Sequence, residues 1–273
     1  MSQGGRGCGV FTSLPSYMAA VAELPLSAAL TEDVGGAVVV VPGSGDWWQG
    51  MLAARAGGAS AVVVADPGVL PREVLESEPW PGGIPVIVER PLLRPDFVAD
   101  AVRARRSSPA RIITVECAAP AASLDAVIRD GFGWQRSLVQ GRLTLRSSVA
   151  TAQGRMALLD HEAASGGSVP ATLAATVMGG IHAGGLLQVL ALGEVRTEVT
   201  VDQPAGLMRL ETSAEDGTLR APDRYESSAR LALRRAFEAC ASGGAVTDLE
   251  DLLEDMALTG DLLRPVGANW PRV

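Results

Sequence analysis

The residues with the clearest chemical potential are Gly43, Ser44 and Gly45, which form a turn shortly after the apolar run Ala37–Val41. An apolar helical pattern follows this turn. A glycine turn between a strand and a helix presents backbone N–H groups that bind phosphate. The usual spacing is broken at the third glycine, where Trp48 would obstruct close packing of the helix on the strand. The turn is therefore a candidate phosphate site that departs from the usual motif at its third glycine.

Carboxylates follow two later apolar runs. Asp66 and Pro67 come directly after Ala61–Ala65, and Glu89 and Arg90 close the next run. Asp66 lies about 20 residues beyond the glycine turn, which is the spacing of an acid that binds a ribose hydroxyl. We therefore take Asp66, Pro67 and Glu89, together with the glycine turn, as candidate cofactor contacts.

The chain contains two histidines, His161 and His182. His161 stands between Asp160 and Glu162, but adjacent side chains point in different directions, so a shared ion is not expected. We predict a solvated turn there and no metal site. His182 is a candidate acid–base group, with a helical histidine packed at a domain interface as the alternative.

All 23 cationic residues are arginine, and lysine is absent. Chemistry that needs an amine, such as Schiff-base formation, is therefore excluded. Arg90 keeps its charge at any working pH, so it can clamp a carboxylate or phosphate but cannot transfer a proton. We expect Arg90 and His182 to be the residues nearest any reaction.

The composition excludes several classes of protein. A net charge of −8 over 273 residues, without a basic stripe, opposes nucleic-acid binding. The apolar runs are far shorter than the ~20 residues of a membrane span, and the N-terminus does not resemble a secretion signal. Three cysteines without CxxC spacing predict neither a disulfide framework nor a cysteine zinc site. We expect a cytoplasmic protein.

The first part of the chain alternates β-branched runs with helical patterns. Such alternation predicts α/β structure with a parallel sheet, since continuous Val and Ile runs suit strands buried on both faces. Residues 1–120 are expected to form this domain, with Arg111–Glu116 as its last strand.

Residues 121–273 read as an α+β domain with a large, mostly antiparallel open sheet, and the last helices are candidates to pack back on the first domain. We expect a helix at Leu124–Arg129, a turn at Asp130-Gly131, and one helix over Pro170–Leu192, with Gly179-Gly180 as the point where it can break. Period-two patterns predict the strands. The expected strands are Gln135–Ala150, Val195–Val201, Leu207–Thr212 and Thr218–Arg220. The expected closing helices are Glu226–Ser242 and Asp248–Leu263.

Four segments, in order, resemble the Gfo/Idh/MocA family of nicotinamide-dependent oxidoreductases. The segment ASAVVVADPGVLPREVLESEPWPGGIPVIVERPLL is similar to a strand ending in Thr-Pro, a helix, and a strand ending in Glu-Lys-Pro-Leu. VIRDGFGWQRSLVQGRLTL, GGIHAGGLLQVLALGEVRTEV and LRRAFEACASGGAVTDLEDLLEDMALTGDLL resemble later helices and strands of the family. The resemblance covers about Ala61 to Leu263, and each piece alone is weak.

The resemblance implies a Rossmann domain followed by an α+β domain, with NAD(P) as cofactor. It also places the family's catalytic lysine at Arg90 and its histidine at His182, while the expected Asp residues are replaced by Met178 and Gly185. The family's open sheet commonly faces a second subunit. A homodimer, or a heterodimer with an active paralogue, is therefore implied, and a small-molecule ligand is compatible with the same fold.

Two interpretations of the glycine turn remain. In the first, Ala37–Val41 is the opening strand of the nucleotide-binding sheet, and the turn holds the pyrophosphate. In the second, which we favour, Ala61–Ala65 is the family's fourth strand, so the nucleotide-binding half is shortened. The spacing of Asp66-Pro67 from Glu89-Arg90 matches the second interpretation.

We therefore expect a shortened, degenerate member of the family, a pseudoenzyme that is non-catalytic or binds a ligand and could be the partner subunit of an active paralogue. It would bind no cofactor if the usual site has been lost. The alternative is an active NAD(P)-dependent oxidoreductase acting on a sugar-like or biosynthetic intermediate. In that case the glycine turn binds pyrophosphate, and His182 with Arg90 handles the substrate.

Overall fold

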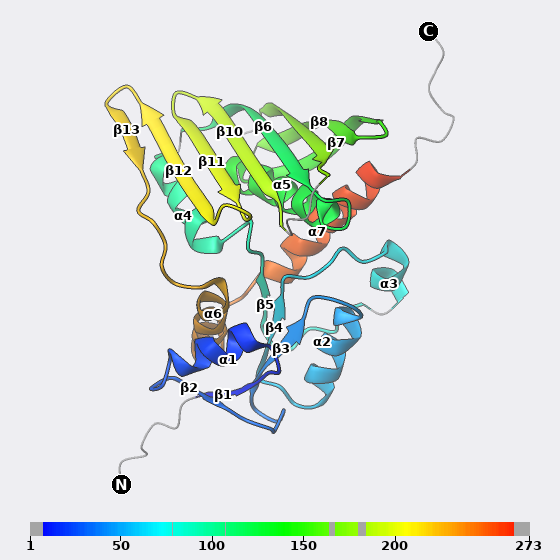
Figure 1. Cartoon of the computed structure of the whole chain (residues 1–273), viewed down its shortest axis with the longest axis vertical. Coiled ribbons are helices and arrows are strands. Elements are labelled where there is room, and N and C mark those ends of the chain that lie inside the picture. The colour runs from blue at the N-terminus through cyan, green and yellow to red at the C-terminus, as the bar shows by residue number, and fades with distance from the viewer. Residues whose placement is uncertain (1–7, 78, 107, 164–166, 180–183, 265–273) are drawn as a thin grey trace. The chain divides into compact units, whose positions relative to one another are not determined.

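The computed structural model describes residues 8–77, 79–106, 108–163, 167–179 and 184–264 (Figure 1). It divides the chain into two compact units. The first contains the residues up to Pro91 together with Arg224–Leu253, and the second contains Leu92–Asp223 and the residues from Glu254 onward. Each unit is built on its own sheet. Among the described residues, no helix has the length and apolar character needed to cross a membrane.

The first unit is a five-stranded parallel sheet with helices on both faces, in the strand order β2-β1-β3-β4-β5. Its elements are β1 (Cys8–Phe11), α1 (Pro15–Ala22), β2 (Ala28–Leu30), β3 (Val38–Pro42), α2 (Trp47–Ala56), β4 (Ala61–Ala65), α3 (Arg72–Ser77), β5 (Val86–Glu89) and α6 (Ser228–Ser242).

The central strands β3 and β4 are buried on both faces, as their continuous valine runs predict. Val38 and Val40 share a core with residues of α1 and α6. The alternate residues, such as Val39 and Val41, face the other way, where α2 contacts β3 and β4. The sheet is therefore held between α1 and α6 on one face and α2 on the other.

The strand order corrects the strand assignment in both interpretations of the glycine turn. Two strands, β1 and β2, precede Ala37–Val41, so its expected role as the opening strand is wrong. In the standard order 3-2-1-4-5-6 the fourth strand lies beside the first, and here β3 lies beside β1, so the favoured assignment of Ala61–Ala65 as the family's fourth strand is also wrong. The order matches the six-stranded order 3-2-1-4-5-6 without its outermost strand. The shortened Rossmann-like sheet that the sequence predicts is confirmed.

The second unit is an eight-stranded sheet in the order β13-β12-β11-β10-β6-β9-β8-β7. All neighbours are antiparallel except β6 and β9, which run parallel. Its elements are α4 (Pro95–Ala104), β6 (Ala110–Ala119), α5 (Leu124–Val139), β7 (Gly141–Ala150), β8 (Gly154–Ala163), β9 (Ser168–Val177), β10 (Leu186–Gly193), β11 (Arg196–Asp202), β12 (Leu207–Ala214) and β13 (Gly217–Arg220).

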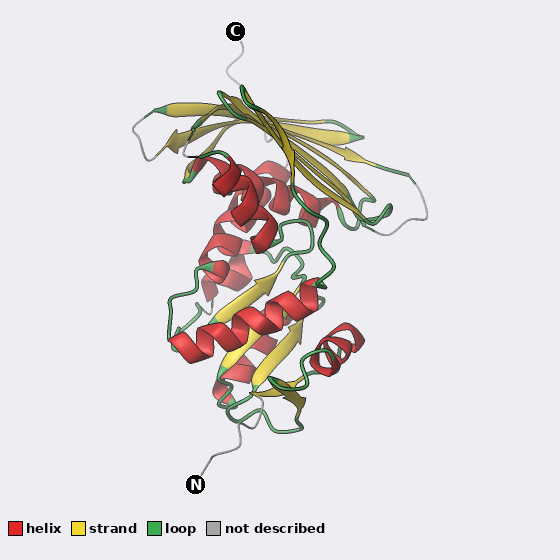
Figure 2. Ribbon diagram, turned by 90° about the vertical axis from the view of Figure 1, so that its left-hand side faces the viewer, coloured by secondary structure: helices red, strands yellow, loops and turns green. Residues whose placement is uncertain are grey.

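Helices cover one face of this large sheet and leave the other face open (Figure 2). Helix α5 packs across β6 and β9, and the core of the unit lies between them. The strands alternate accordingly, with Ile113 and Val115 inward and Thr114 and Glu116 outward on β6. This confirms the open, mostly antiparallel sheet expected for the second half of the chain.

Four expectations about this half are wrong. Arg111–Glu116 belongs to β6 of the large sheet and not to the parallel sheet, because only one of its faces is buried. The helix α5 continues through Asp130-Gly131, where we expected a turn, and on to Val139, although we expected a strand from Gln135 onward. Pro170–Leu192 contains no helix among its described residues, but the strands β9 and β10.

His161 also differs from its prediction of a solvated turn. It lies on β8, opposite Leu143 of β7 and Val169 of β9, and its side chain is fully buried. Neither ring nitrogen has a hydrogen-bond partner among the described residues. Burial lowers the pKa of His161 to about 4, and nearby backbone groups of Gln135 and Gly141 oppose the shift in part. The imidazole is therefore a neutral part of the core.

The last helix, α7 (Asp248–Leu263), contributes to both units. In the first unit, Asp248 accepts hydrogen bonds from the Arg235 guanidinium at 2.7 and 2.8 Å and from the Val88 N–H at 3.0 Å. In the second unit, Asp255 accepts two hydrogen bonds from Arg136, both of 3.1 Å. Charge-assisted pairs thus hold the first residue of the helix in the first unit and Asp255, at its middle, in the second.

Candidate functional site

The carboxyl ends of β3, β4 and β5 meet at one edge of the parallel sheet, and the predicted site residues lie there. The Gly43 N–H donates to the Ala65 carbonyl at 2.8 Å, and the Asp66 N–H donates to the Glu89 carbonyl at 3.0 Å. The Gly68 N–H returns to the Gly43 carbonyl at 2.8 Å. The structure therefore brings Gly43, Asp66 and Glu89 together, while their role as cofactor contacts stays a prediction.

The other candidate site residues differ in how far they are buried. Ser44 and Gly45 are exposed in the turn that joins β3 to α2, whereas Pro67 is buried. Arg90 follows β5 and is only 5% exposed. His182 lies outside the described residues, so its predicted role stays a prediction.

Different structural constraints favour glycine at positions 43 and 45. A Cβ on Gly43 would overlap the carbonyl oxygens of Ala65 and Asp66, so this glycine permits close approach of β3 to the end of β4. Gly45 has a φ of +70° with open space around it, which is a conformation that glycine adopts without strain. Strand packing and turn geometry therefore account for both glycines without a bound phosphate.

Asp46 occupies the N-terminus of α2, where the glycine turn would hold a phosphate. Its carboxylate accepts a hydrogen bond of 3.2 Å from the Gln49 N–H. This is an ordinary helix cap, and it places a negative charge at the partly positive helix end. An anion approaching the same N–H groups would be repelled by this carboxylate.

Trp47 and Trp48, which follow Asp46, are each only 1% exposed. The Trp47 indole N–H donates to the Gly68 carbonyl at 3.0 Å, and the two rings contact edge to face with centroids 5.5 Å apart. Both rings are core groups, so neither is available to stack on a ligand.

The point where the strand order reverses lies between β1 and β3, and in doubly wound sheets ligands bind outside the carboxyl ends of such strands. The turn after β1 is therefore the position of the phosphate fingerprint G-x-G-x-x-G. Here the six residues after β1 read TSLPSY, with Thr12, Leu14 and Tyr17 at the glycine positions. Pro15 begins α1 and has no N–H to donate to a phosphate.

Tyr17 fills part of this edge with its own side chain. It is 1% exposed, and its hydroxyl donates to Glu89 Oε2 at 2.7 Å. Burial raises the pKa of the Tyr17 hydroxyl strongly, and the negative charges of Glu89 and Asp66 raise it further. The phenol therefore stays protonated and acts as a fixed donor to Glu89.

These residues do not fit the pyrophosphate of a dinucleotide. A third glycine normally allows close packing of helix and strand, but Tyr17 stands there as a buried bulky group. Asp46, Asp66 and Glu89 make the nearby strand and helix ends acidic. Close approach of a doubly charged pyrophosphate would need backbone N–H groups and positive charge instead.

One element of a dinucleotide site is nevertheless present after β2. In the standard motif an acid about 20 residues beyond the glycine turn, following the second strand, binds the ribose. The strand β2 ends at Leu30, and Glu32 follows it with an exposed side chain. We expected Asp66 in this role, but Asp66 follows β4, two strands away from β1.

Sequence reasoning missed Tyr17, Thr12 and Leu14 because it missed β1. That strand has four residues, and β2 has only three, so neither shows a period. The available signal was the short apolar run Cys8–Phe11 followed by proline at the start of a helical pattern. Among the residues that the structure describes, no three His, Cys, Asp or Glu side chains gather as metal ligands.

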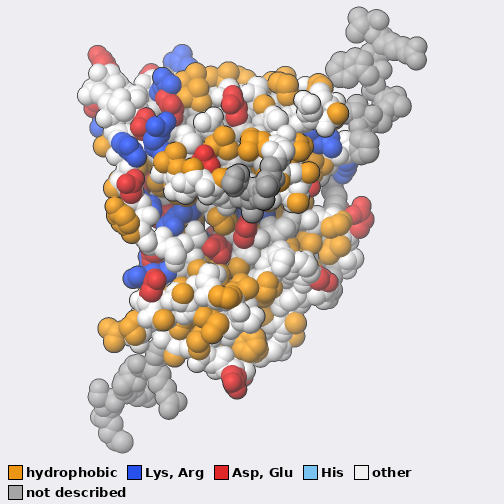
Figure 3. Space-filling view, in the orientation of Figure 1, with side chains coloured by type: hydrophobic (Ala, Val, Ile, Leu, Met, Phe, Trp, Pro, Cys, Tyr) orange, Lys and Arg blue, Asp and Glu red, His pale blue; other side chains and the backbone are white. Residues whose placement is uncertain are grey.

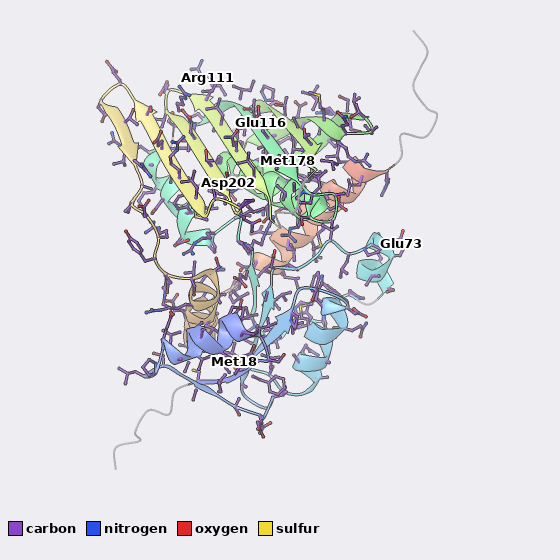
Figure 4. All side chains as sticks on the ribbon, viewed as in Figure 1. Met18, Glu73, Arg111, Glu116, Met178 and Asp202 are labelled. Carbon is purple, nitrogen blue, oxygen red and sulfur yellow. The ribbon has the colours of Figure 1, made fainter. Side chains whose placement is uncertain are left out.

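A second candidate binding region lies on the open face of the large sheet. It is a shallow depression of about 220 Å³ over β6, β10, β11 and β12. Glu116, labelled in Figure 4, contributes a carboxylate, and Glu198 is paired with Arg196 at 2.5 Å. The polar side chains that line the depression are those of Thr114, Glu116, Gln188, Glu198, Thr200 and Arg209.

Solved structures resemble the chain over nearly its whole length. An oxidoreductase from Sinorhizobium meliloti matches with a TM-score of 0.64 at 9% identity, covering 94% of this chain and 96% of that one. The 3-ketoreductase KijD10 from Actinomadura kijaniata, in complex with NADP, matches with 0.64 at 15% identity, covering 94% and 97%.

The UDP-N-acetylglucosamine 3-dehydrogenase GnnA from Acidithiobacillus ferrooxidans has a TM-score of 0.60 at 12% identity, covering 93% of this chain and 95% of its own. No protein-family model and no curated protein sequence matches the chain. At these identities the similarity is one of fold. The chain has the two-domain fold of the Gfo/Idh/MocA-type oxidoreductases, the family that its sequence resembles.

Proposed function

We propose that this protein is a non-catalytic relative of the NAD(P)-dependent oxidoreductases that share its fold, and that it acts as a binding or partner protein. The observation that carries the proposal is the turn after β1, where buried Tyr17 and the residues before it replace the phosphate-binding glycines. The absence of lysine supports it, because Arg90 cannot transfer the proton that accompanies a hydride.

The binding surface in this proposal is the open face of the eight-stranded sheet. Large apolar side chains are exposed there on neighbouring strands, with Val149 at 59%, Met156 at 61% and Leu158 at 47%. Val149 and Met156 lie directly opposite each other on β7 and β8. Exposed apolar patches of this kind mark interaction sites, so a second copy or an active paralogue is the proposed partner.

The test is a titration with NADPH and with NADH, followed by thermal unfolding. A cofactor with a Kd of about 10 μM, present at about 100 times that value, would stabilise a protein by about 2.7 kcal/mol. That corresponds to a rise in Tm of at least about 5 °C. We expect no shift with either cofactor, and a saturable rise would contradict the proposal.

The second candidate function is an active NAD(P)-dependent oxidoreductase, and the place of Glu32 after β2 favours it. If a cofactor shift occurs, Glu32→Ala separates this candidate from unspecific binding. Removal of a ribose contact would abolish the shift, whereas Glu73→Ala on exposed α3, labelled in Figure 4, would leave it unchanged. Equal shifts in both variants would place any binding elsewhere.

A further inference from the structure

Side chains on the open face of the large sheet lie in rows that cross the strands, because residues directly opposite each other on neighbouring strands point to the same side. Two neighbouring rows cross the central strands β6 and β10 and the adjoining strand β11. The first row consists of Thr114, Leu190 and Glu198. The second row, two residues along the strands and about 7 Å away, consists of Ile112, Leu192 and Arg196. These two rows form the centre of the open face.

The two rows match each other in chemistry. Each has a leucine on β10, and the residues on β11 carry opposite charges, Glu198 in the first row and Arg196 in the second. Ile112 and Leu192 of the second row are each 37% exposed, so apolar surface reaches the solvent there. An operation that exchanges the two rows would therefore place leucine against leucine and carboxylate against guanidinium.

A two-fold rotation between two copies performs this exchange. When two surfaces meet face to face, the two-fold axis lies in the plane of contact, so a line between the rows and parallel to them can be the axis. The leucines and the charged residues lie along this one line. Glu198 and Arg196 of one chain are already paired at 2.5 Å, and the axis runs between them. The ion pairs of the two copies then lie side by side in opposite directions, so each carboxylate has a guanidinium on two sides.

The shape of the face fits the same rotation. The depression described above lies entirely on the first-row side of the axis, and its lining residues on the two central strands are Thr114, Glu116 and Gln188–Leu190. Ile112 and Leu192, on the other side of the axis, are exposed and do not line it. The rotation therefore brings the exposed apolar side chains of one copy over the depression of the other.

Glu116 and Arg111, both labelled in Figure 4, extend the charge pattern along β6. Neither forms an ion pair with another residue that the structure describes. Arg111 is the extra residue of a bulge between β6 and β10, and it is exposed. A carboxylate that a partner covers needs a cation opposite it. The axis lies between these two residues, so Arg111 of one copy faces Glu116 of the other.

The surface of the second unit is mixed in character. Over the upper part of the space-filling view, where Figure 1 places the strands of this unit, apolar side chains are interspersed with charges of both signs (Figure 3). A partner with a purely apolar surface would leave such charges buried and unpaired. A second copy supplies a leucine for each leucine of the rows and an opposite charge for Glu116, Arg111, Glu198 and Arg196.

We propose that two copies of this chain join face to face through their open sheets, about a two-fold axis between the two rows. The proposal rests on the proposed function, in which the open face is the binding surface, and it selects a second copy as the partner. Sheets packed face to face keep their strand directions within about 30° of each other. The match between the rows is therefore closest at the central strands β6 and β10.

The first test reverses charges on β6 and measures the mass of the assembly by analytical ultracentrifugation. Arg111→Glu places two carboxylates opposite each other at both symmetry-related sites, and Glu116→Arg places two guanidinium groups there. We expect each variant to associate at least about 100-fold more weakly than the wild type and to sediment with half its mass. Glu73→Arg is the matched control, because it changes the net charge as Glu116→Arg does but lies on α3 of the first unit, where Glu73 is exposed. It should keep the wild-type mass.

The second test restores the pairing and so separates a lost contact from a damaged fold. In an equimolar mixture of Arg111→Glu and Glu116→Arg, opposite charges face each other again at both sites. A chain that carries both substitutions restores them as well. We therefore expect the mixture and the double variant to recover the wild-type mass. If either of them keeps the mass of a single chain, or if a single variant keeps the wild-type mass, the proposal is wrong.

The outcomes for this interface and for the proposed function can be told apart. A wild-type protein that sediments as one chain at high concentration would contradict the face-to-face dimer, whatever the cofactor titration shows. If the titration also gives no shift, the proposed function stands and its partner is a different protein. A saturable shift with NADPH or NADH in a protein that forms this dimer would overturn the proposed function alone.

Discussion

Tyr17 connects the turn after β1 with the end of β5, and its hydroxyl is the part of this arrangement that can be removed most cleanly. Tyr17→Phe deletes the 2.7 Å hydrogen bond to Glu89 and keeps the buried ring. We expect the free energy of unfolding to fall by about 1–2 kcal/mol, because the acceptor is a carboxylate. Urea unfolding at neutral pH measures this loss.

The control for this substitution is Tyr225→Phe. The protein has two tyrosines, and Tyr225 is 95% exposed. Its hydroxyl faces water, so its removal should leave the urea midpoint unchanged. Equal midpoints for both variants would mean that the hydrogen bond from Tyr17 to Glu89 adds nothing to the free energy of unfolding.

His161 should make the stability depend on pH. Its pKa is about 4 in the folded protein because it is buried, whereas an unfolded histidine has a pKa of about 6.5. Above pH 6.5 both states are neutral there. Below pH 6.5 the unfolded chain binds a proton at His161 that the folded protein does not bind. The free energy of unfolding therefore decreases as the pH falls, by about 3 kcal/mol at pH 4.

The comparison with His161→Leu isolates this contribution. Carboxyl groups titrate in the same range in both proteins, so their effect cancels in the difference. We expect the free energy of unfolding, measured with urea at several pH values, to fall more steeply for the wild type between pH 6.5 and 4. Parallel curves would show that His161 is protonated in the folded protein.

At the scale of elements, the approach of β3 to β4 should depend on Gly43 much more than on Gly45. An alanine methyl at Gly43 would overlap backbone carbonyl oxygens of Ala65 and Asp66, which cannot move aside. We expect Gly43→Ala to cost about 3 kcal/mol of stability. Gly45→Ala meets open space and only the strain of its φ of +70°, which costs about 1 kcal/mol.

Thermal or urea unfolding of the two alanine variants tests this ranking. Similar losses would contradict the strand-packing role of Gly43. The ranking is informative because a phosphate-binding turn would make both glycines matter for ligand binding, and neither especially for folding.

The sequence predicted most elements whose pattern is long and periodic. The runs at β3, β4 and β5 and the closing helices were predicted because continuous valines and amphipathic periods are strong signals. The convergence of Gly43, Asp66 and Glu89 followed from them, since the carboxyl ends of parallel strands share one edge. Tyr17 was missed because β1 and β2 are too short to show a period.

Glycine and alanine misled the prediction in the second unit. Gly131 was read as a turn, but it lies within α5, where an added Cβ would come within 3.0 Å of Val115 and 3.1 Å of Leu173. The glycine therefore lets the helix lie close to the sheet. Pro170–Leu192 was expected to be helical, although the residues of β9 alternate between buried and more exposed positions up to Ala175. Tertiary packing decided both cases against local propensity.

At the scale of the whole molecule, the two units present different surfaces to partners. The second unit has an open sheet face that mixes apolar side chains with charges of both signs, such as Glu116 and Arg209. The first unit exposes apolar side chains on α1 and just after it, namely those of Met18, Leu26 and Leu30. If both surfaces bind copies of this chain, each can be removed separately, and the mass of the assembly reports each loss.

Met156→Glu tests the open face of the sheet. Met156 is 61% exposed and lies opposite Val149, so a carboxylate there would be buried without a partner if the face is an interface. We expect association through this face to weaken by at least about tenfold, measured by sedimentation. Leu219→Glu serves as control, because Leu219 pairs with buried Thr212 and so points to the covered side of the sheet.

The combination of Met156→Glu with Leu26→Glu separates the two surfaces. If both are interfaces, each single variant lowers the mass and the double variant sediments as one chain. If Met156→Glu alone leaves the mass unchanged while Leu26→Glu lowers it, the sheet face does not join copies of this chain, and the proposed partner there must be a different protein. If the wild-type protein associates and both variants keep its mass, neither surface joins copies of this chain. An unpaired carboxylate buried in an interface would weaken the association.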